Sequence, residues 1–296
     1  MSAKSKTKHF IQVHCVFMIL AVITLRSHGQ NLPGENTIIK VYKTIDTTKL
    51  SMDLIYPANF EKNKKFPAMI FFFGGGWSGG TIEQFRPHAL YFSSRGMITV
   101  LANYRVSSRN KTTPFEAVKD ARSAIRYLRK NAEALAIDTG CIVASGGSAG
   151  GHLAAATGNI PGPQEAGEDI SVSSKPNALV LFNPVFDNGP DGYGFDRVGG
   201  ESHYREISPI HNIRQGAPPT IIFLGTKDPL IPVATAELYK KRMLDVGSRC
   251  ELFLYPDQKH GFFNVANPEY YQKTVYEADV FLNTLGYIAG KPTIIK

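Results

Sequence analysis

A serine at position 148 lies in a run of very small residues, between a strand-like segment that ends at Ser145 and a helix-like segment that follows. A serine on so sharp a turn adopts a strained backbone, and the residues two before and two after it must have almost no side chain. Gly146 and Gly150 meet that requirement. The helix start points free N–H groups, the first from Ala149, toward any negative charge that develops beside Ser148. This pattern predicts a nucleophile with an oxyanion donor beside it.

A serine nucleophile needs a base to take its proton and a carboxylate to orient that base. On this kind of turn the expected chain order is serine, acid, histidine. Asp228 follows the strand-like run Thr220–Leu224, and His260 follows the run Cys250–Tyr255. Both residues therefore fall at carboxyl ends of strands, where open α/β sheets place their sites. We predict a catalytic triad of Ser148, Asp228 and His260.

Two other residues compete for these roles. Asp257 lies three residues before His260, so its carboxylate would reach the imidazole only if the loop doubled back. His152 lies one turn into the helix after Ser148, and we expect it to pack against neighbouring elements instead of acting as the base.

A second glycine-rich segment, Gly74–Gly80, follows the apolar strand-like run Ala68–Phe73. One interpretation is that the N–H groups of Gly75 and Gly76 join that of Ala149 in an oxyanion hole. The alternative is a dinucleotide-binding loop, because the spacing matches G-x-G-x-x-G. That fingerprint expects an acidic residue at the end of the next strand, and the run there ends in Asn-Tyr-Arg. We therefore favour the oxyanion hole, and we predict no cofactor and no metal.

Together these segments resemble the α/β-hydrolase carboxylesterases of the acetyl-esterase and hormone-sensitive-lipase-like group, over residues 38 to 285. The greatest similarity is to bacterial acetyl xylan esterase-like and feruloyl esterase-like enzymes. The resemblance rests on Gly74-Gly75-Gly76-Trp77, Asn103-Tyr104-Arg105, Gly146 to Gly151, Gly225 to Asp228 and His260-Gly261-Phe262. The loop that commonly begins His-Gly-Gly-Gly in this family begins here with Phe73. Asp120 matches a position that is structural in relatives, and we expect no catalytic role for it.

Strand-like and helix-like segments alternate after an opening pair of strands at Ile38–Ile45 and Leu50–Tyr56. This alternation predicts a mainly parallel central sheet with helices on both faces. The resemblance implies the α/β-hydrolase fold, and we expect no large N-terminal cap, because few residues lie between the expected signal peptide and Ile38. Further strand-like runs begin at Ala68, Met97, Cys141, Ala178, Thr220 and Cys250, and helix-like stretches cover Phe115–Lys130, Val233–Leu244 and Glu269–Leu285.

The segment Asn183–Ala217 is the least regular part of the chain and is rich in glycine and proline. We expect it to form a short flap beside the site. Aromatic residues in and around this region are candidate contacts for a sugar or an acyl group, and the alternative for each is packing in the core. They are Trp77, Tyr104, Phe186 and Tyr193.

Residues 1–29 have the pattern of a secretory signal peptide, with three lysines, then an apolar stretch, then small residues. We expect cleavage near Gln30 and a secreted or periplasmic hydrolase domain over residues 30–296. His14 interrupts the apolar stretch, and we therefore expect no stable membrane span after cleavage.

Charge and cysteine content narrow the partners further. The formal net charge is +8, of which four charges lie in residues 1–29, so the expected mature chain carries +4. Its basic runs lack the interleaved aromatics of nucleic-acid grooves, and we expect no nucleic-acid binding. Cys141 and Cys250 begin strands that the expected order separates by two others, about 14 Å apart. We predict free, buried thiols.

The residues and the resemblance together imply a secreted serine carboxylesterase that removes short acyl groups, with acetyl as the expected group, from a plant or algal polysaccharide. Its substrate would be an acylated carbohydrate or a small ester. Four alternatives remain: a feruloyl esterase, a lipase-like hydrolase of small esters, an exopeptidase, and a binding module without catalysis.

Overall fold

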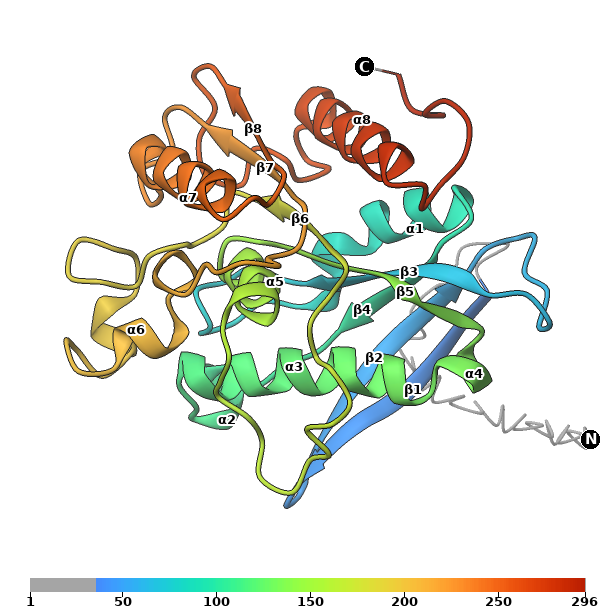
Figure 1. The fold of residues 1–296 in the computed structure, drawn as a ribbon, viewed down its shortest axis with the longest axis horizontal. Coiled ribbons are helices and arrows are strands. Elements are labelled where there is room, and N and C mark those ends of the chain that lie inside the picture. The colour runs from blue at the N-terminus through green and yellow to red at the C-terminus, as the bar shows by residue number, and fades with distance from the viewer. Residues whose placement is uncertain (1–35, 296) are drawn as a thin grey trace, which may run out of the picture. The chain divides into compact units, whose positions relative to one another are not determined.

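A computed structural model describes residues 36–295, which form one eight-stranded sheet with helices on both faces (Figure 1). The expected signal peptide, residues 1–29, lies outside the described residues. The strand order is β1-β2-β4-β3-β5-β6-β7-β8. The bounds are β1 Asn36–Ile45, β2 Thr48–Tyr56, β3 Phe66–Phe72, β4 Ile98–Ala102, β5 Ile137–Gly147, β6 Ala178–Phe182, β7 Thr220–Gly225 and β8 Cys250–Tyr255.

Strands β3 to β8 are parallel to one another, whereas β1 pairs antiparallel with β2 and β2 pairs antiparallel with β4. The opening pair of strands and the mainly parallel sheet are therefore confirmed. The central parallel strands are buried on both faces, which explains their continuous apolar sequences. Because their carboxyl ends meet at one edge, the loops after β3, β5, β7 and β8 come together there.

Two apolar cores lie on opposite faces of the sheet. Helices α3, α5 and α7 cover one face, and α1 and α8 cover the other (Figure 1). Three further helices, α2, α4 and α6, each form a single turn. The bounds are α1 Arg86–Ser94, α2 Ser107–Asn110, α3 Pro114–Lys130, α4 Ala132–Leu135, α5 Ala149–Asn159, α6 Tyr204–Ile207, α7 Val233–Asp245 and α8 Pro268–Thr284.

Helix α3 shows how local sequence sets an element's limits. Thr113 and Glu116 form a reciprocal capping box at its start, and Pro114 occupies the first helical position. Two basic residues fill its last turn, where they oppose the partial negative charge of the helix end. The expected helix over residues 115–130 is confirmed.

Asp120 on α3 is fully buried and binds two basic side chains. Its carboxylate lies 2.7 Å from Lys43 Nζ and 2.8 Å from Arg105 Nη2. Glu165 completes this cluster by pairing with the same two basic residues. These ion pairs join β1, α3 and the segment after β4, in accordance with the structural role expected of Asp120.

Cys141 and Cys250 are free thiols, as expected, and the sheet order places β6 and β7 between their strands. Cys250 is buried, which raises the pKa of its thiol to about 12. Cys141 is only half-buried, so the expectation of full burial was wrong for this residue, because β5 begins four residues earlier than the sequence indicated. Within residues 36–295, no helix has the length and apolar character that a membrane span requires.

Candidate active site

Ser148 lies on the sharp turn between β5 and α5, with a backbone φ of 55° and ψ of −120°. A side chain on Gly146 would come within 2.5 Å of the Gly150 backbone, and one on Gly150 would come within 2.0 Å of the Phe72 carbonyl oxygen. The turn therefore requires glycine at both positions. The Ser148 amide donates to the Phe182 carbonyl oxygen at 3.0 Å, which ties the turn to β6.

The structure brings the three residues of the predicted triad together. His260 Nε2 lies 2.8 Å from Ser148 Oγ, and His260 Nδ1 lies 2.7 Å from Asp228 Oδ2. With Nδ1–H donating to the carboxylate, the lone pair on Nε2 faces the serine hydroxyl and is positioned to accept its proton.

The Asp228 carboxylate is held by its own turn. Its side chain is fully buried, and Oδ1 accepts the backbone N–H groups of Leu230 and Ile231 at 2.8 and 3.0 Å. Oδ2 therefore remains for the imidazole, and the buried negative charge is fully hydrogen-bonded. The His260 side chain is 20% exposed, which leaves it in contact with the pocket above Ser148.

The two competing residues do not reach the site. Asp257 forms a surface ion pair with Lys227 at 2.6 Å, and both side chains are more than half exposed. His152 is fully buried, and its Nε2 lies 2.7 Å from the Ile207 carbonyl oxygen. Burial lowers the pKa of His152 to about 4, so its imidazole is neutral at physiological pH.

The glycine loop after β3 runs beside Ser148. A Cβ on Gly74 would lie 3.4 Å from the Cβ of Ser148, and both Gly75 and Gly76 line the same pocket. Gly75 has φ of 124° and Gly76 has φ of 60°, so both positions favour glycine. Within residues 36–295, the amides of Gly75, Gly76 and Ala149 donate to no protein acceptor. This arrangement fits the predicted oxyanion hole. A dinucleotide-binding loop would not need to lie beside a serine nucleophile, so the position of Gly75 and Gly76 next to Ser148 favours the oxyanion hole.

Gln84 forms a bridge between the glycine loop and the histidine loop that no local sequence signal indicates. Gln84 Oε1 accepts the Gly74 N–H at 2.7 Å, and Gln84 Nε2 donates to Asn264 Oδ1 at 3.0 Å. Asn264 in turn donates to the Gly261 carbonyl oxygen at 2.7 Å. Gln84 thus fixes the loop that carries Gly75 relative to the loop that carries His260.

Asn183, at the end of β6, is a second polar residue that sequence analysis missed. It is fully buried with φ of 32°, and its Oδ1 accepts the Gly261 N–H at 2.9 Å. Its amide nitrogen lies 3.5 Å from His260 Nε2. The side chain therefore holds the histidine loop against the end of the sheet.

Three of the four candidate aromatic residues are buried and do not line the pocket, so for them the packing alternative holds and the contact role does not. Trp77 and Tyr104 are 2% and 1% exposed, and Phe186 is fully buried against Tyr239. The Tyr104 hydroxyl donates to the Phe73 carbonyl oxygen at 2.7 Å, and its ring stacks on the Phe73 ring. Phe73 thus anchors the glycine loop by packing.

Tyr193 lines the pocket above Ser148, in accordance with its expected position. The pocket has a volume of about 260 Å³, and Tyr193, Leu230 and Phe263 form its apolar wall. Tyr193 belongs to the irregular segment 183–217, which lies beside the site as expected. Arg197 from the same segment donates to the Gly76 carbonyl oxygen at 2.6 Å and so attaches it to the glycine loop.

Comparisons with known proteins agree with this geometry. Residues 52–186 match the family described as BD-FAE, and residues 192–285 match the dienelactone hydrolase family. The structure of apo esterase 2 from Thermogutta terrifontis is 43% identical in sequence, with a TM-score of 0.83. The match covers 88% of this chain and 98% of that one. The chain therefore belongs to the esterases of the α/β-hydrolase fold.

Curated relatives are more distant. An acetylxylan esterase from Xylanibacter ruminicola is 28% identical over 64% of this chain and 39% of its own length. Esterase LipC from Mycobacterium tuberculosis is 27% identical over 67% of this chain and 54% of its own length. The chain thus spans about half, or less, of these relatives. The comparisons support carboxylic ester hydrolysis as the activity.

Proposed function

We propose that this protein is a serine carboxylesterase that removes short acyl groups, principally acetyl, from an acylated plant or algal polysaccharide. The observation that carries the proposal is the continuous hydrogen-bonded series from Asp228 through His260 to Ser148, next to free amides on two loops. A nucleophile, a base with its orienting acid, and an oxyanion site are the parts that acyl transfer requires.

The reaction follows from these positions. Ser148 Oγ attacks the ester carbonyl carbon while His260 Nε2 takes the hydroxyl proton. The buried Asp228 carboxylate stabilises the imidazolium that forms. Amides of Ala149, Gly75 and Gly76 donate to the carbonyl oxygen as it gains negative charge. His260 then protonates the departing alcohol, and water, activated by the same imidazole, releases the acid and restores Ser148.

Two observations support a short acyl group. The pocket of about 260 Å³ is smaller than the range of about 300–1,000 Å³ that is usual for ligand sites, and its apolar wall is confined to three side chains. Structures of the Thermogutta terrifontis esterase have propionate or butyrate bound, at 42% identity to this chain. The acetylxylan esterase relative supports a carbohydrate-borne acetyl group as the substrate.

A panel of chromogenic acetyl, butyryl, octanoyl and feruloyl esters, together with acetylated xylan, tests this proposal. We expect the largest kcat/KM for acetyl and butyryl esters and release of acetate from xylan. Ser148→Ala should lower kcat by about 10⁵-fold, whereas Ser94→Ala, at an exposed serine on α1, should have no effect. Preference for octanoyl or feruloyl esters would contradict the short-acyl assignment, and an active Ser148→Ala variant would contradict the nucleophile.

We also propose that the protein is exported, on the basis of the lysines, apolar stretch and small residues within positions 1–29. Mass spectrometry of the protein recovered from its native host tests this. A mature N-terminus near residue 30 is the expected result, and an intact N-terminus in the cytoplasmic fraction would contradict it.

A further inference from the structure

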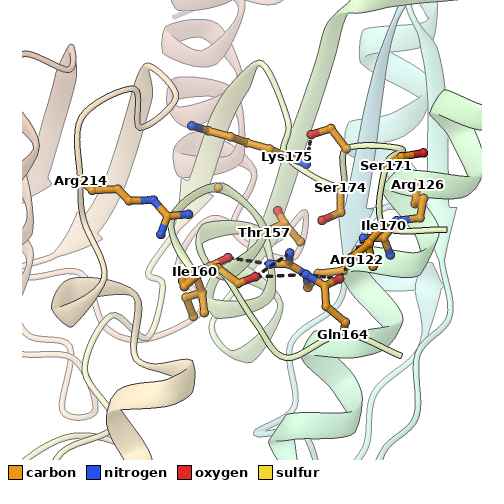
Figure 2. A pocket seen from close by; sticks show the side chains of 13 residues that line it. Arg122, Arg126, Thr157, Ile160, Gln164, Ile170, Ser171, Ser174, Lys175 and Arg214 are labelled. Carbon is orange, nitrogen blue, oxygen red and sulfur yellow. Dashed lines mark hydrogen bonds between the residues drawn. The ribbon is translucent and has the colours of Figure 1, made fainter. Parts of the chain in front are cut away.

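A second cavity, with a volume of about 330 Å³, lies at the C-terminal end of α5 (Figure 2). Helix α3 and the last turn of α5 form part of its wall, and the segment 160–175 and residue Arg214 form the rest. Ser148 lies at the opposite end of α5. Because α5 has eleven residues, about 16 Å of helix separates this cavity from the serine.

Four basic side chains line this cavity: Arg122, Arg126, Lys175 and Arg214. Arg126 forms an ion pair with Glu168. Within residues 36–295, the other three form no ion pair with a carboxylate. The acidic residues nearby are otherwise engaged, because Glu165 pairs with Lys43 and Arg105, and Asp169 accepts hydrogen bonds from Ser171.

Arg122 carries a buried charge that is hydrogen-bonded but not neutralised. Its side chain is buried, and it donates to the carbonyl oxygens of Ile160 and Pro161 at 2.6 and 3.3 Å and to Gln164 Oε1 at 3.3 Å. Ile160 is the C-cap residue of α5, and the C-terminus of this helix supplies a partial negative charge of about half a unit. That partial charge offsets only a fraction of the positive charge on Arg122, Lys175 and Arg214.

The basic groups affect one another across the cavity. Burial, and then the like charges of Arg126 and Arg214, lower the pKa of Arg122 to about 10, although the Glu168 carboxylate opposes this shift. Burial, and then Arg214, also lower the pKa of Lys175. Arg214 therefore acts on both neighbours, and an anion between them would relieve this repulsion.

Donors that the protein leaves unused face the cavity. The guanidinium of Arg214 makes no hydrogen bond within the described part of the chain, and it points toward the side on which Arg122 and Ser174 lie (Figure 2). The hydroxyl of Ser174 has no hydrogen-bond partner there either, although the residue is only 4% exposed. An exposed guanidinium and a recessed hydroxyl thus approach the cavity from different directions.

We propose that this cavity binds a divalent tetrahedral oxyanion, a phosphate or sulfate group. Three basic side chains without a carboxylate partner within residues 36–295 favour an anion that carries more than one negative charge over a single carboxylate. Donors placed on different sides match the divergent oxygens of a tetrahedral group better than the planar oxygens of a carboxylate. The volume is about ten times the ~30 Å³ occupied by one water molecule, so the cavity admits the group with some of its hydration.

Isothermal titration calorimetry of the full-length protein at low ionic strength tests the site, with sodium sulfate, sodium phosphate and sodium acetate as titrants. We expect one site with Kd below about 1 mM for sulfate and phosphate, and at least ten-fold weaker binding of acetate. A parallel titration with a sulfated disaccharide shows whether the site prefers a sulfate group carried by a glycan or the free inorganic ion. Tighter binding than inorganic sulfate identifies a group carried by a glycan, and equal binding identifies the free ion.

Variants distinguish specific binding of sulfate in this cavity from the general attraction of anions to a basic protein. Arg214→Gln removes an exposed guanidinium and should weaken sulfate binding at least ten-fold, and Ser174→Ala should weaken it about three-fold while leaving the charge unchanged. Lys62→Gln removes one charge at an exposed position outside the cavity and should leave Kd unchanged. Equal Kd values for Arg214→Gln and Lys62→Gln, or equal binding of sulfate and acetate, would overturn the proposal. The test does not depend on esterase activity.

Discussion

At its N-terminal end, α5 meets Ser148 and a loop of glycines, whereas at its C-terminal end it meets three basic side chains without carboxylate partners. The charges at both ends agree with the helix dipole, which stabilises negative charge at the N-terminal end and positive charge at the C-terminal end. At the first end, the negative charge exists only during a reaction, so neutral amides without competing partners suffice. At the second end, the positive charges are permanent and exceed the half unit that the helix end supplies.

The two ends of α5 therefore suit two different kinds of site. Around Ser148, the buried Asp228 carboxylate is hydrogen-bonded on both oxygens, and within residues 36–295 the amides of Gly75, Gly76 and Ala149 have no protein acceptor. Around Arg214, charge itself is in excess. The first arrangement favours a transition state and the second favours a stable anion.

The largest expected effect comes from altering the single buried carboxylate at the Ser148 end. Asp228→Asn keeps the size of the side chain but no longer stabilises the imidazolium, so kcat should fall by about 10⁴-fold with little change in KM. Asp257→Asn is the matched control, because Asp257 pairs with Lys227 on the surface, and its kcat should stay within two-fold of wild type. If the two variants had similar kcat, the acid would be misassigned.

The next largest effect should come from adding a side chain at the start of α5, where the backbone is tightly packed. Gly150→Ala would place a Cβ within 2.0 Å of the Phe72 carbonyl oxygen, so the free energy of unfolding should fall by about 3 kcal/mol. Gly79→Ala meets open space and should change it by less than about 0.5 kcal/mol. Urea denaturation measures both. A Gly150→Ala variant as stable as Gly79→Ala would show that the turn is looser than described.

His152, between the two ends of α5, should make stability depend on pH. Burial lowers the pKa of His152 to about 4, against about 6.5 when unfolded, so the unfolded state takes up its proton first as pH falls. This contribution to stability is present above pH 6.5 and is lost progressively toward pH 4. His152→Gln keeps a donor for the Ile207 carbonyl oxygen but does not titrate.

Urea denaturation at pH 7 and pH 4.5 measures this contribution. Between these values, wild type should lose about 2 kcal/mol more unfolding free energy than His152→Gln. Equal losses in the two proteins would contradict the burial of a neutral imidazole.

The smallest effect should come from the bridge between the two loops of the active site. Gln84→Met removes the acceptor of the Gly74 N–H and the donor to Asn264, so kcat should fall by about ten-fold with KM nearly unchanged. Gln272→Met, at an exposed position on α8, is the control and should retain wild-type kcat. A Gln84→Met variant that changed only KM would place Gln84 in substrate binding instead of loop positioning.

Sequence order predicted the sheet and the three residues that meet at its edge, because strand-end position and the glycines around Ser148 are local properties. The bridge through Gln84 was not predictable, since its partners Gly74 and Asn264 are joined only by the packing of loops far apart in sequence. The burial of Trp77 and Tyr104 was not predictable for a related reason. An aromatic side chain beside a glycine loop is buried when other segments of the chain pack over it, and the sequence alone does not show which segments do so.

The basic cavity was hidden from sequence for a comparable physical reason. Arg122 lies on a helix whose charged face looks solvated, and Arg214 lies in an irregular segment about ninety residues later. Only the fold brings them to one cavity, and only the contacts show which charges lack partners.

In the proposed mechanism, His260 activates Ser148 beside amide donors that have no protein acceptor within residues 36–295. Labelling with a fluorophosphonate, followed by peptide mass spectrometry, tests this activation, since the reagent phosphonylates an activated serine hydroxyl. We expect a single adduct on the peptide that contains Ser148 in wild-type protein, and labelling at least 10³-fold slower in His260→Ala. An adduct on another serine, or equal labelling rates in the two proteins, would contradict the account.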